Sequence, residues 1–155
     1  VLFLKHVMER VRAEVPEARL ILATRDVAAF DGAEIVHTPD FAALRAVLQR
    51  DAVVVCPRVS WSGYPIKLLN AMAAGKAIVA CRGAAHPLEH ERTGLIVDDN
   101  NEGAFAAAVV TLMRDPALRA SMGAAARRAA VDHHSPARFA ESLERVFERA
   151  LLYAS

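Results

Sequence analysis

Apolar residues recur along the chain with two different periods, and this difference separates candidate helices from candidate strands. Residues 2–15 carry apolar side chains three and four positions apart, which is the spacing of an amphipathic helix that ends before Pro16. Short apolar runs rich in β-branched residues indicate buried strands. The pattern predicts strands over residues 19–24, 34–37, 52–56, 77–81 and 94–97. It predicts helices over residues 2–15, 41–50, 65–74, 102–114, 116–131 and 136–152.

Polar and special residues at the ends of these segments support the same boundaries. Asp40, Asp115 and Ser135 are suited to cap the helices that follow them, and Gly75 is suited to end the helix before it. Strands that alternate with helices predict an α/β protein with a Rossmann-like, mostly parallel sheet and helices on both faces. Ligands bind at the carboxyl ends of the strands in such sheets. The candidate loops are residues 25–32, the turn after His37, residues 57–64 and residues 82–93.

Composition narrows the classes of protein that fit this pattern. The 155 residues are 54% hydrophobic and 24% charged, which fits one folded domain and excludes a disordered chain. The formal net charge of +1 lacks the basic excess typical of nucleic-acid binding. No apolar run approaches the roughly 20 residues of a membrane span. The two cysteines favour a reducing, cytoplasmic location over a disulfide framework. The chain opens without a recognisable signal peptide. Because it also lacks an initiator methionine, we expect a piece of a longer protein.

The loop after the strand at 52–56 carries the most chemistry. It leaves a buried strand and enters a helix at Pro65, which is predicted to be the first helical residue. Gly63 would let the backbone approach a ligand closely, and the free amides of the first helical turn form an anion site. Lys67 adds a positive charge there, and the amide of Asn70 suits a sugar hydroxyl. The alternative is an ordinary helix start with a solvated lysine.

Residues 62–80 read SGYPIKLLNAMAAGKAIVA. This segment resembles the signature of family 4 (group 1) glycosyltransferases, Glu-Gly-x-Pro-x-x-x-Leu-Glu-Ala-Met-Ala-x-Gly-x-Pro-Val-Val-Ala. Further segments resemble the family in order and spacing, so the resemblance covers nearly the whole chain. They are residues 15–22, 93–97, 114–119, 122–123 and 133–136.

The resemblance implies the C-terminal, donor-binding half of a GT-B enzyme that transfers a sugar from a UDP- or GDP-linked donor with retention. It implies no metal and no cofactor beyond that substrate. Residues 1–155 would form a single nucleotide-sugar-binding domain without its first strand and without the N-terminal acceptor domain, and inactive by itself. Lys67 is the implied catalytic residue. The implied donor-binding residues are Arg58, Ser62, Gly63, Tyr64, Pro65, Ile66, Asn70, Gly83 and His86.

The chain departs from the family pattern at two places. The two acids of the signature fall on Ser62 and Asn70, of which Asn70 can still bond ribose hydroxyls. The family's Gly-Gly-x-Pro-Glu loop is one residue shorter here, with His86 in the place of the acid. These departures leave open a degenerate GT-B domain that scaffolds or regulates without catalysis.

Several weaker features have plainer readings. The adjacent His133 and His134 point apart on a helix and make poor joint metal ligands. Cys56 and Cys81 are expected to be buried small residues. The helix at 2–15 fits a core position, or a peripheral membrane contact in the longer protein. A response-regulator-like binding module needs an acidic cluster at strand ends, which Asp26 and Asp31 hardly supply.

Overall fold

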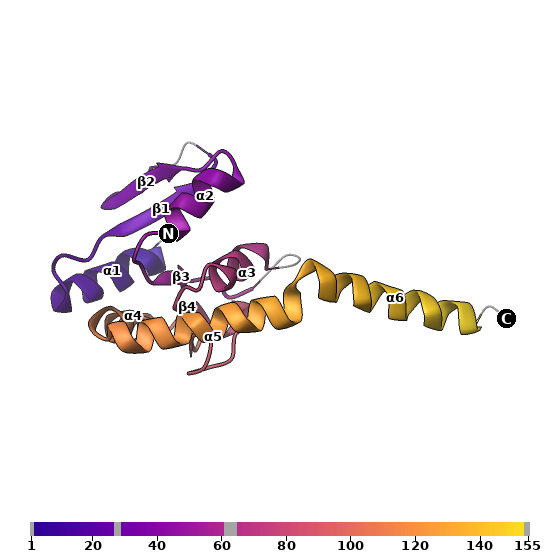
Figure 1. The fold of residues 1–155 in the computed structure, drawn as a ribbon. Coiled ribbons are helices and arrows are strands. Elements are labelled where there is room, and N and C mark those ends of the chain that lie inside the picture. Colours follow the sequence, from indigo (N-terminus) through magenta and orange to yellow (C-terminus); the bar gives the residue numbers. More distant parts are fainter. Residues whose placement is uncertain (1, 27–28, 61–64, 154–155) are drawn as a thin grey trace.

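A computed structural model describes residues 2–26, 29–60 and 65–153, with side chains up to residue 149. The strands are β1 (Leu20–Thr24), β2 (Ala33–His37), β3 (Val54–Cys56), β4 (Ile78–Cys81) and β5 (Leu95–Val97). The helices are α1 (Leu2–Glu14), α2 (Phe41–Leu48), α3 (Ile66–Ala73), α4 (Glu102–Arg114), α5 (Pro116–His134) and α6 (Pro136–Tyr153), with a short 3-10 helix η1 (Arg82–Ala84). The predicted order of strands and helices is confirmed (Figure 1).

Strand pairing divides the sheet into two parts. β1 pairs in parallel with β2, and β3, β4 and β5 form a second parallel ladder in that order. The sequence pattern predicted a single sheet, but within the described residues no ladder joins β1 to β3. An apolar cavity of about 260 Å³, the inter-sheet cavity, lies at this break and is lined by Phe3, Leu4, Leu20, Leu22, Phe30 and Pro57. β1 was predicted to be buried, but only Leu20 is, and its other four residues are half-buried.

β4 is the centre of the domain because both of its faces are covered. Its side chains alternate between the faces, as in any strand. Val79 and Cys81 join one core with α1, α4 and β5, whereas Ile78 and Ala80 join a second core with α3 and α5. All four residues of β4 are buried, which explains their continuous apolar sequence. The predicted arrangement of helices on both faces is therefore confirmed for β3–β5.

α1 is a core helix. Val7, Met8 and Val11 are buried in the core that α1 shares with α4. The core position expected for this helix is therefore confirmed. None of the helices in the described part of the chain is long and apolar enough to cross a membrane.

Two glycines let α3 end tightly against α5. Gly75 follows α3 with φ of +69°, its amide donates to Met72, and the next amide, of Lys76, donates to Ala71. This is the Schellman arrangement expected of a C-terminal glycine. Gly123 of α5 packs on this turn so closely that an added Cβ would lie 2.1 Å from the carbonyl oxygen of Gly75. The predicted role of Gly75 is confirmed, and the close approach of α5 depends on Gly123 as well.

The remaining caps were largely predictable. Asp40 and Asp115 accept the amides of Ala43 and Leu118, both at 2.8 Å, as expected. Ser135 accepts the amide of Arg138 at 3.4 Å. Asn101, which the sequence reading missed, accepts the amide of Ala104 at 2.9 Å and caps α4.

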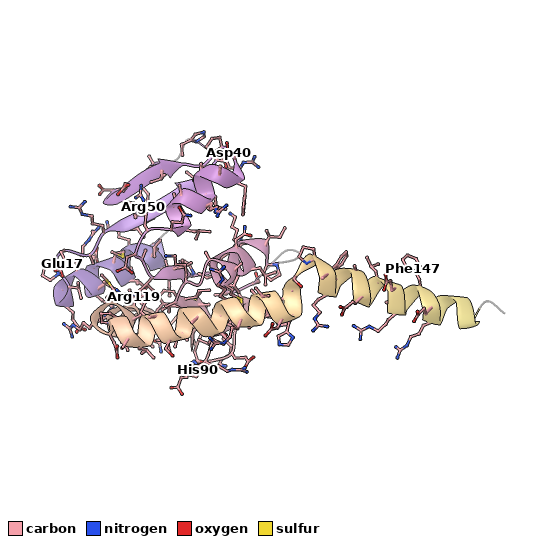
Figure 2. The ribbon with its side chains drawn as sticks, viewed as in Figure 1. Glu17, Asp40, Arg50, His90, Arg119 and Phe147 are labelled. Carbon is pink, nitrogen blue, oxygen red and sulfur yellow. The ribbon has the colours of Figure 1, made fainter. Side chains whose placement is uncertain are left out.

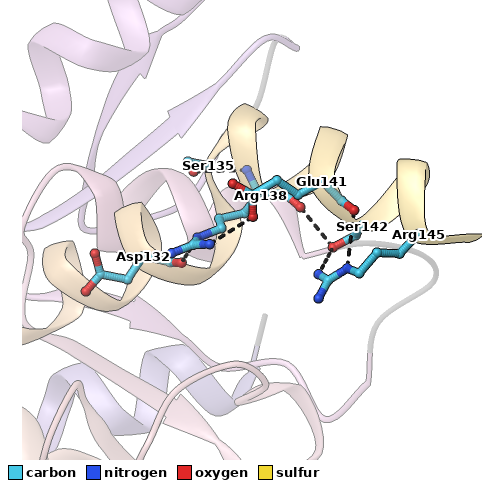
Figure 3. Close-up of polar contacts among 6 residues, drawn as sticks. All are labelled: Asp132, Ser135, Arg138, Glu141, Ser142 and Arg145. Carbon is cyan, nitrogen blue, oxygen red and sulfur yellow. Dashed lines mark hydrogen bonds and ion pairs between the residues drawn. The ribbon is translucent and has the colours of Figure 1, made fainter.

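α6 extends away from the rest of the domain after a bend at Ser135 (Figure 1). Arg138 secures the bend by donating from Nε to the carbonyl oxygen of Asp132 at 3.0 Å, and it pairs with Glu141 at 2.8 Å (Figure 3). Every described side chain of α6 is exposed. Its apolar stripe is Phe139, Leu143, Val146 and Phe147, and Figure 2 shows Phe147 on the projecting part of the helix.

Candidate functional site

The carboxyl ends of β3, β4 and β5 meet at one edge, because the three strands are parallel and in register. A cavity of about 340 Å³, the edge cavity, opens there. It is lined by Phe3, Pro57, Arg58, Val59, Ser60, Cys81 and Asn100. The predicted ligand-binding edge therefore does carry a cavity, and the guanidinium of Arg58 gives its lining a positive charge.

The loops that follow these strands touch one another. The amide of Gly83 donates to Asp99 Oδ1 at 3.0 Å, and Arg82 Nε donates to Asp98 Oδ1 at 2.8 Å. Gly83 also lies against the loop after β3, where an added Cβ would be 1.9 Å from the carbonyl oxygen of Val59. Gly83 was expected in a long loop, but it lies in the 3-10 helix η1.

The start of α3 keeps the features of an anion site. Pro65 was predicted to be the first helical residue, but it occupies the cap position, because helical geometry begins one residue later, at Ile66. The side chain of Pro65 accepts no cap hydrogen bond, so it satisfies none of the first amides of α3. Ile66 and Lys67 are exposed, and Asn70 is half-buried one turn further along.

The structure brings only some of the predicted site residues together. Arg58 lines the edge cavity, whereas Lys67, Asn70 and His86 do not. Ser62, Gly63 and Tyr64, together with Trp61, lie outside the described residues. His86 is exposed. Burial lowers the pKa of His134, and the positive charges that His133 and His86 carry when protonated lower it further. His86 therefore lies near the carboxyl end of α5.

Sequence reasoning missed the loop after β5. Asp98, Asp99 and Asn100 follow the last strand at the same edge, and Asn100 lines the edge cavity with φ of +61°. The run of four polar residues at 98–101 directly after an apolar strand was the available signal. Phe3 was also missed, because its place in α1 suggested only a core role. It packs edge-on against Phe105 with ring centroids 5.5 Å apart.

The two thiols are buried, as predicted, and unpaired. Cys56 faces the α3 side of the sheet and Cys81 faces the α1 side. The two thiols therefore lie on opposite faces of the sheet, although β3 and β4 are neighbouring strands. Burial raises the pKa of the Cys56 thiol. Burial raises that of Cys81 to about 11, with a smaller contribution from the negative charge of Asp99. In the part of the chain that the structure describes, no group of three His, Cys, Asp or Glu side chains could hold a metal ion.

The fold and its ligand edge define a class of protein, which is the parallel α/β half of a GT-B glycosyltransferase. The chain is similar to a sucrose-phosphate synthase from Thermosynechococcus elongatus with a TM-score of 0.78 and 21% identity, over 97% of this chain and 42% of that one. It is similar to the C-terminal domain of the glycosyl transferase group 1 family protein LpcC from Francisella tularensis, with a TM-score of 0.65 and 19% identity, over 84% and 78% of the two chains.

The family follows from the sequence itself. The chain belongs to the family described as glycosyl transferases group 1, which matches residues 1–115. It is 42% identical over 76 residues to the D-inositol 3-phosphate glycosyltransferase of Pseudarthrobacter chlorophenolicus. That match covers 48% of this chain and 18% of the relative, so the chain spans a small part of the curated protein it matches. A structure of HepE from Anabaena with UDP and glucose is also similar, with a TM-score of 0.67 and 16% identity over 77% of this chain and 32% of that one.

Proposed function

We propose that this chain is the donor-binding domain of a retaining glycosyltransferase that uses a UDP- or GDP-linked sugar. The observation that carries the proposal is the edge cavity, which lies at the carboxyl ends of β3–β5 and has Arg58 in its lining. A guanidinium is suited to bidentate contact with a phosphate. The structurally similar HepE was crystallised with UDP and glucose, which favours a UDP-linked donor over a GDP-linked one.

The start of α3 would stabilise the charge that develops on the leaving diphosphate. The first-turn amides of α3, which the side chain of Pro65 does not cap, and the Lys67 ammonium both favour an anion at that point. A lysine is unfavourable beside a bare helix N-terminus, and a bound phosphate reverses this penalty. Asn70 would hold a ribose hydroxyl, and Gly83 and His86 would lie towards the donor sugar.

The domain needs more chain than these residues for catalysis. β1 and β3 leave a gap that is lined by Leu20, Leu22 and Pro57. We propose that a preceding strand of the longer protein fills it and that an N-terminal domain supplies the acceptor site. The curated relative and the similar sucrose-phosphate synthase both extend well beyond the part that this chain matches, which supports the proposal.

Ligand binding by the longer natural protein tests the proposal. Saturation-transfer NMR against UDP-, GDP- and ADP-sugars should show one clear binder. Lys67→Ala should then weaken its binding about tenfold or more, because a hydrogen bond to a charged group is lost. Lys76→Ala is the matched control, since Lys76 lies beyond the other end of α3 and donates to the carbonyl oxygen of Arg50. Loss of binding in both variants alike, or in neither, would contradict the assignment of Lys67.

A second candidate is a GT-B domain that binds but does not catalyse. Ser62 in the place of the first signature acid favours it, because a neutral hydroxyl cannot supply a carboxylate contact to the donor sugar. Sugar transfer or donor hydrolysis by the folded full-length protein would eliminate this candidate. Binding of the donor without either reaction would support it.

A further inference from the structure

Asp99, in the loop after β5, connects that loop to the loop after β4 beside the edge cavity. Its Oδ1 atom accepts the amide hydrogen of Gly83 at 3.0 Å, so a residue that follows β5 holds the segment that follows β4. The neighbouring Asp98 makes a different contact, an ion pair with Arg82 in which both side chains are about two-thirds exposed or more. Exposed ion pairs of this kind contribute little to stability.

The Gly83 amide needs an acceptor from elsewhere in the fold. It belongs to the first turn of η1, where amides have no partner within the helix. The residue at the cap position is Cys81, whose side chain makes no cap hydrogen bond. The Asp99 carboxylate therefore caps η1 from another loop, and a carboxylate on a backbone amide is a strong, charge-assisted acceptor.

The position of Gly83 in turn decides the position of the loop after β3. Gly83 lies so close to Val59 that an added Cβ would be 1.9 Å from its carbonyl oxygen and 2.8 Å from its carbonyl carbon. Val59 lines the edge cavity, and so does Asn100, the residue after Asp99. A shift of Gly83 away from Asp99 would therefore change the cavity wall on both sides.

We propose that Asp99 is a positioning residue of the donor site. Through the amide of Gly83 it holds residues 82–86 against Val59, and this contact sets the width of the edge cavity and the place of His86. The proposal rests on the proposed function, because it assigns the edge cavity to the nucleotide sugar. Asp99 itself does not line that cavity and is not assigned a contact with the donor.

The test compares three variants of the longer natural protein. Asp99→Ala removes the acceptor, Asp99→Asn keeps an acceptor oxygen without the charge, and Asp98→Ala removes one negative charge from the adjacent position. For each, the dissociation constants of UDP-glucose and GDP-mannose, the thermal midpoint and the hydrogen exchange of residues 82–86 are measured. Where turnover is detected, KM for the donor and kcat are measured separately.

Asp99→Ala should weaken binding of the preferred donor by about five- to tenfold and speed exchange in residues 82–86 by at least as much. Asp98→Ala should stay within about twofold of the wild type. Asp99→Asn should fall between the wild type and Asp99→Ala, because it keeps an acceptor oxygen but loses the charge, and KM should change more than kcat. Wild-type affinity in Asp99→Ala would overturn the positioning role alone, as would equal losses in Asp98→Ala. An Asp99→Asn variant as weak as Asp99→Ala would overturn the hydrogen-bond explanation. A folded wild type that binds neither donor would refute the proposed function first, and this proposal with it.

Discussion

Gly123→Ala tests whether the contact between α3 and α5 depends on a missing side chain. In a solvent-exposed helix this substitution would stabilise the protein by about 1 kcal/mol, because alanine loses less backbone entropy than glycine. Here the new Cβ would lie 2.1 Å from the carbonyl oxygen of Gly75 and 2.9 Å from its carbon. Carbon and oxygen atoms do not approach that closely, so α5 must move by about 1 Å or more from the turn that ends α3.

The cost of this movement should outweigh the gain in helix propensity. Overpacking a well-packed interface costs about 1–3 kcal/mol, and a backbone atom cannot move aside as a side chain can. We expect a net loss of about 2 kcal/mol in the free energy of unfolding. For a chain of this size that loss lowers the thermal midpoint by about 4–8 °C. Differential scanning calorimetry and urea unfolding of the purified protein measure both quantities.

Gly103→Ala is the matched control, since Gly103 also lies in a helix. Its Cβ would meet only the Asn101 side chain, at 3.8 Å, so the substitution should be neutral or stabilising by up to about 1 kcal/mol. A Gly123→Ala protein as stable as the wild type would refute the steric argument. Equal losses in both variants would show that helix propensity had been misjudged instead.

Two further predictions concern the core and the thiols. Phe105→Ala should lower the free energy of unfolding, measured in urea, by about 3–5 kcal/mol, because Phe105 is fully buried and packs on Phe3. Phe147→Ala should change it by no more than about 0.5 kcal/mol, because Phe147 is 64% exposed. Similar losses at both positions would contradict the placement of α6. The pKa of both thiols is raised in the folded protein, so their contribution to stability is complete below pH 9 and falls as the pH rises towards the folded value, about 11 for Cys81. Neither thiol should react with a disulfide reagent at pH 8 until the protein unfolds, and rapid labelling of the folded protein would contradict their burial. Asp99→Asn should lower the pKa of Cys81, because it removes a nearby negative charge.

Local signals were sufficient where an element's neighbours are near in sequence. The helix at 41–48 is capped by Asp40, which was readable because an aspartate preceded an apolar periodic segment. The Asn101 cap of the helix at 102–114 is equally local but was missed. The boundaries were wrong by one to three residues at several ends. Helix α5 continues to His134, and α3 begins at Ile66 rather than at Pro65. Such ends depend on the last hydrogen bonds of each helix, which the apolar pattern does not specify.

The candidate site was only partly predictable for a related reason. Arg58 was readable, because it follows a strand whose end had to lie at the ligand edge. The role of Asp99 was not, because its partner Gly83 is 16 residues away and the two meet only when β4 and β5 pair. The closeness of Gly83 to Val59 depends in the same way on the pairing of β3 with β4.

The sequence by itself determined the alternation of strands and helices, the parallel α/β class and the family, because periodicity, caps and the 62–80 signature are local properties of the chain. The tertiary structure alone decided which surfaces meet. It left β1 unpaired with β3, brought the loops after β3 and β5 to one cavity at the end of β4, and directed α6 away from the core at Ser135. These outcomes depend on contacts between residues far apart in the chain, and close packing of whole elements selects them.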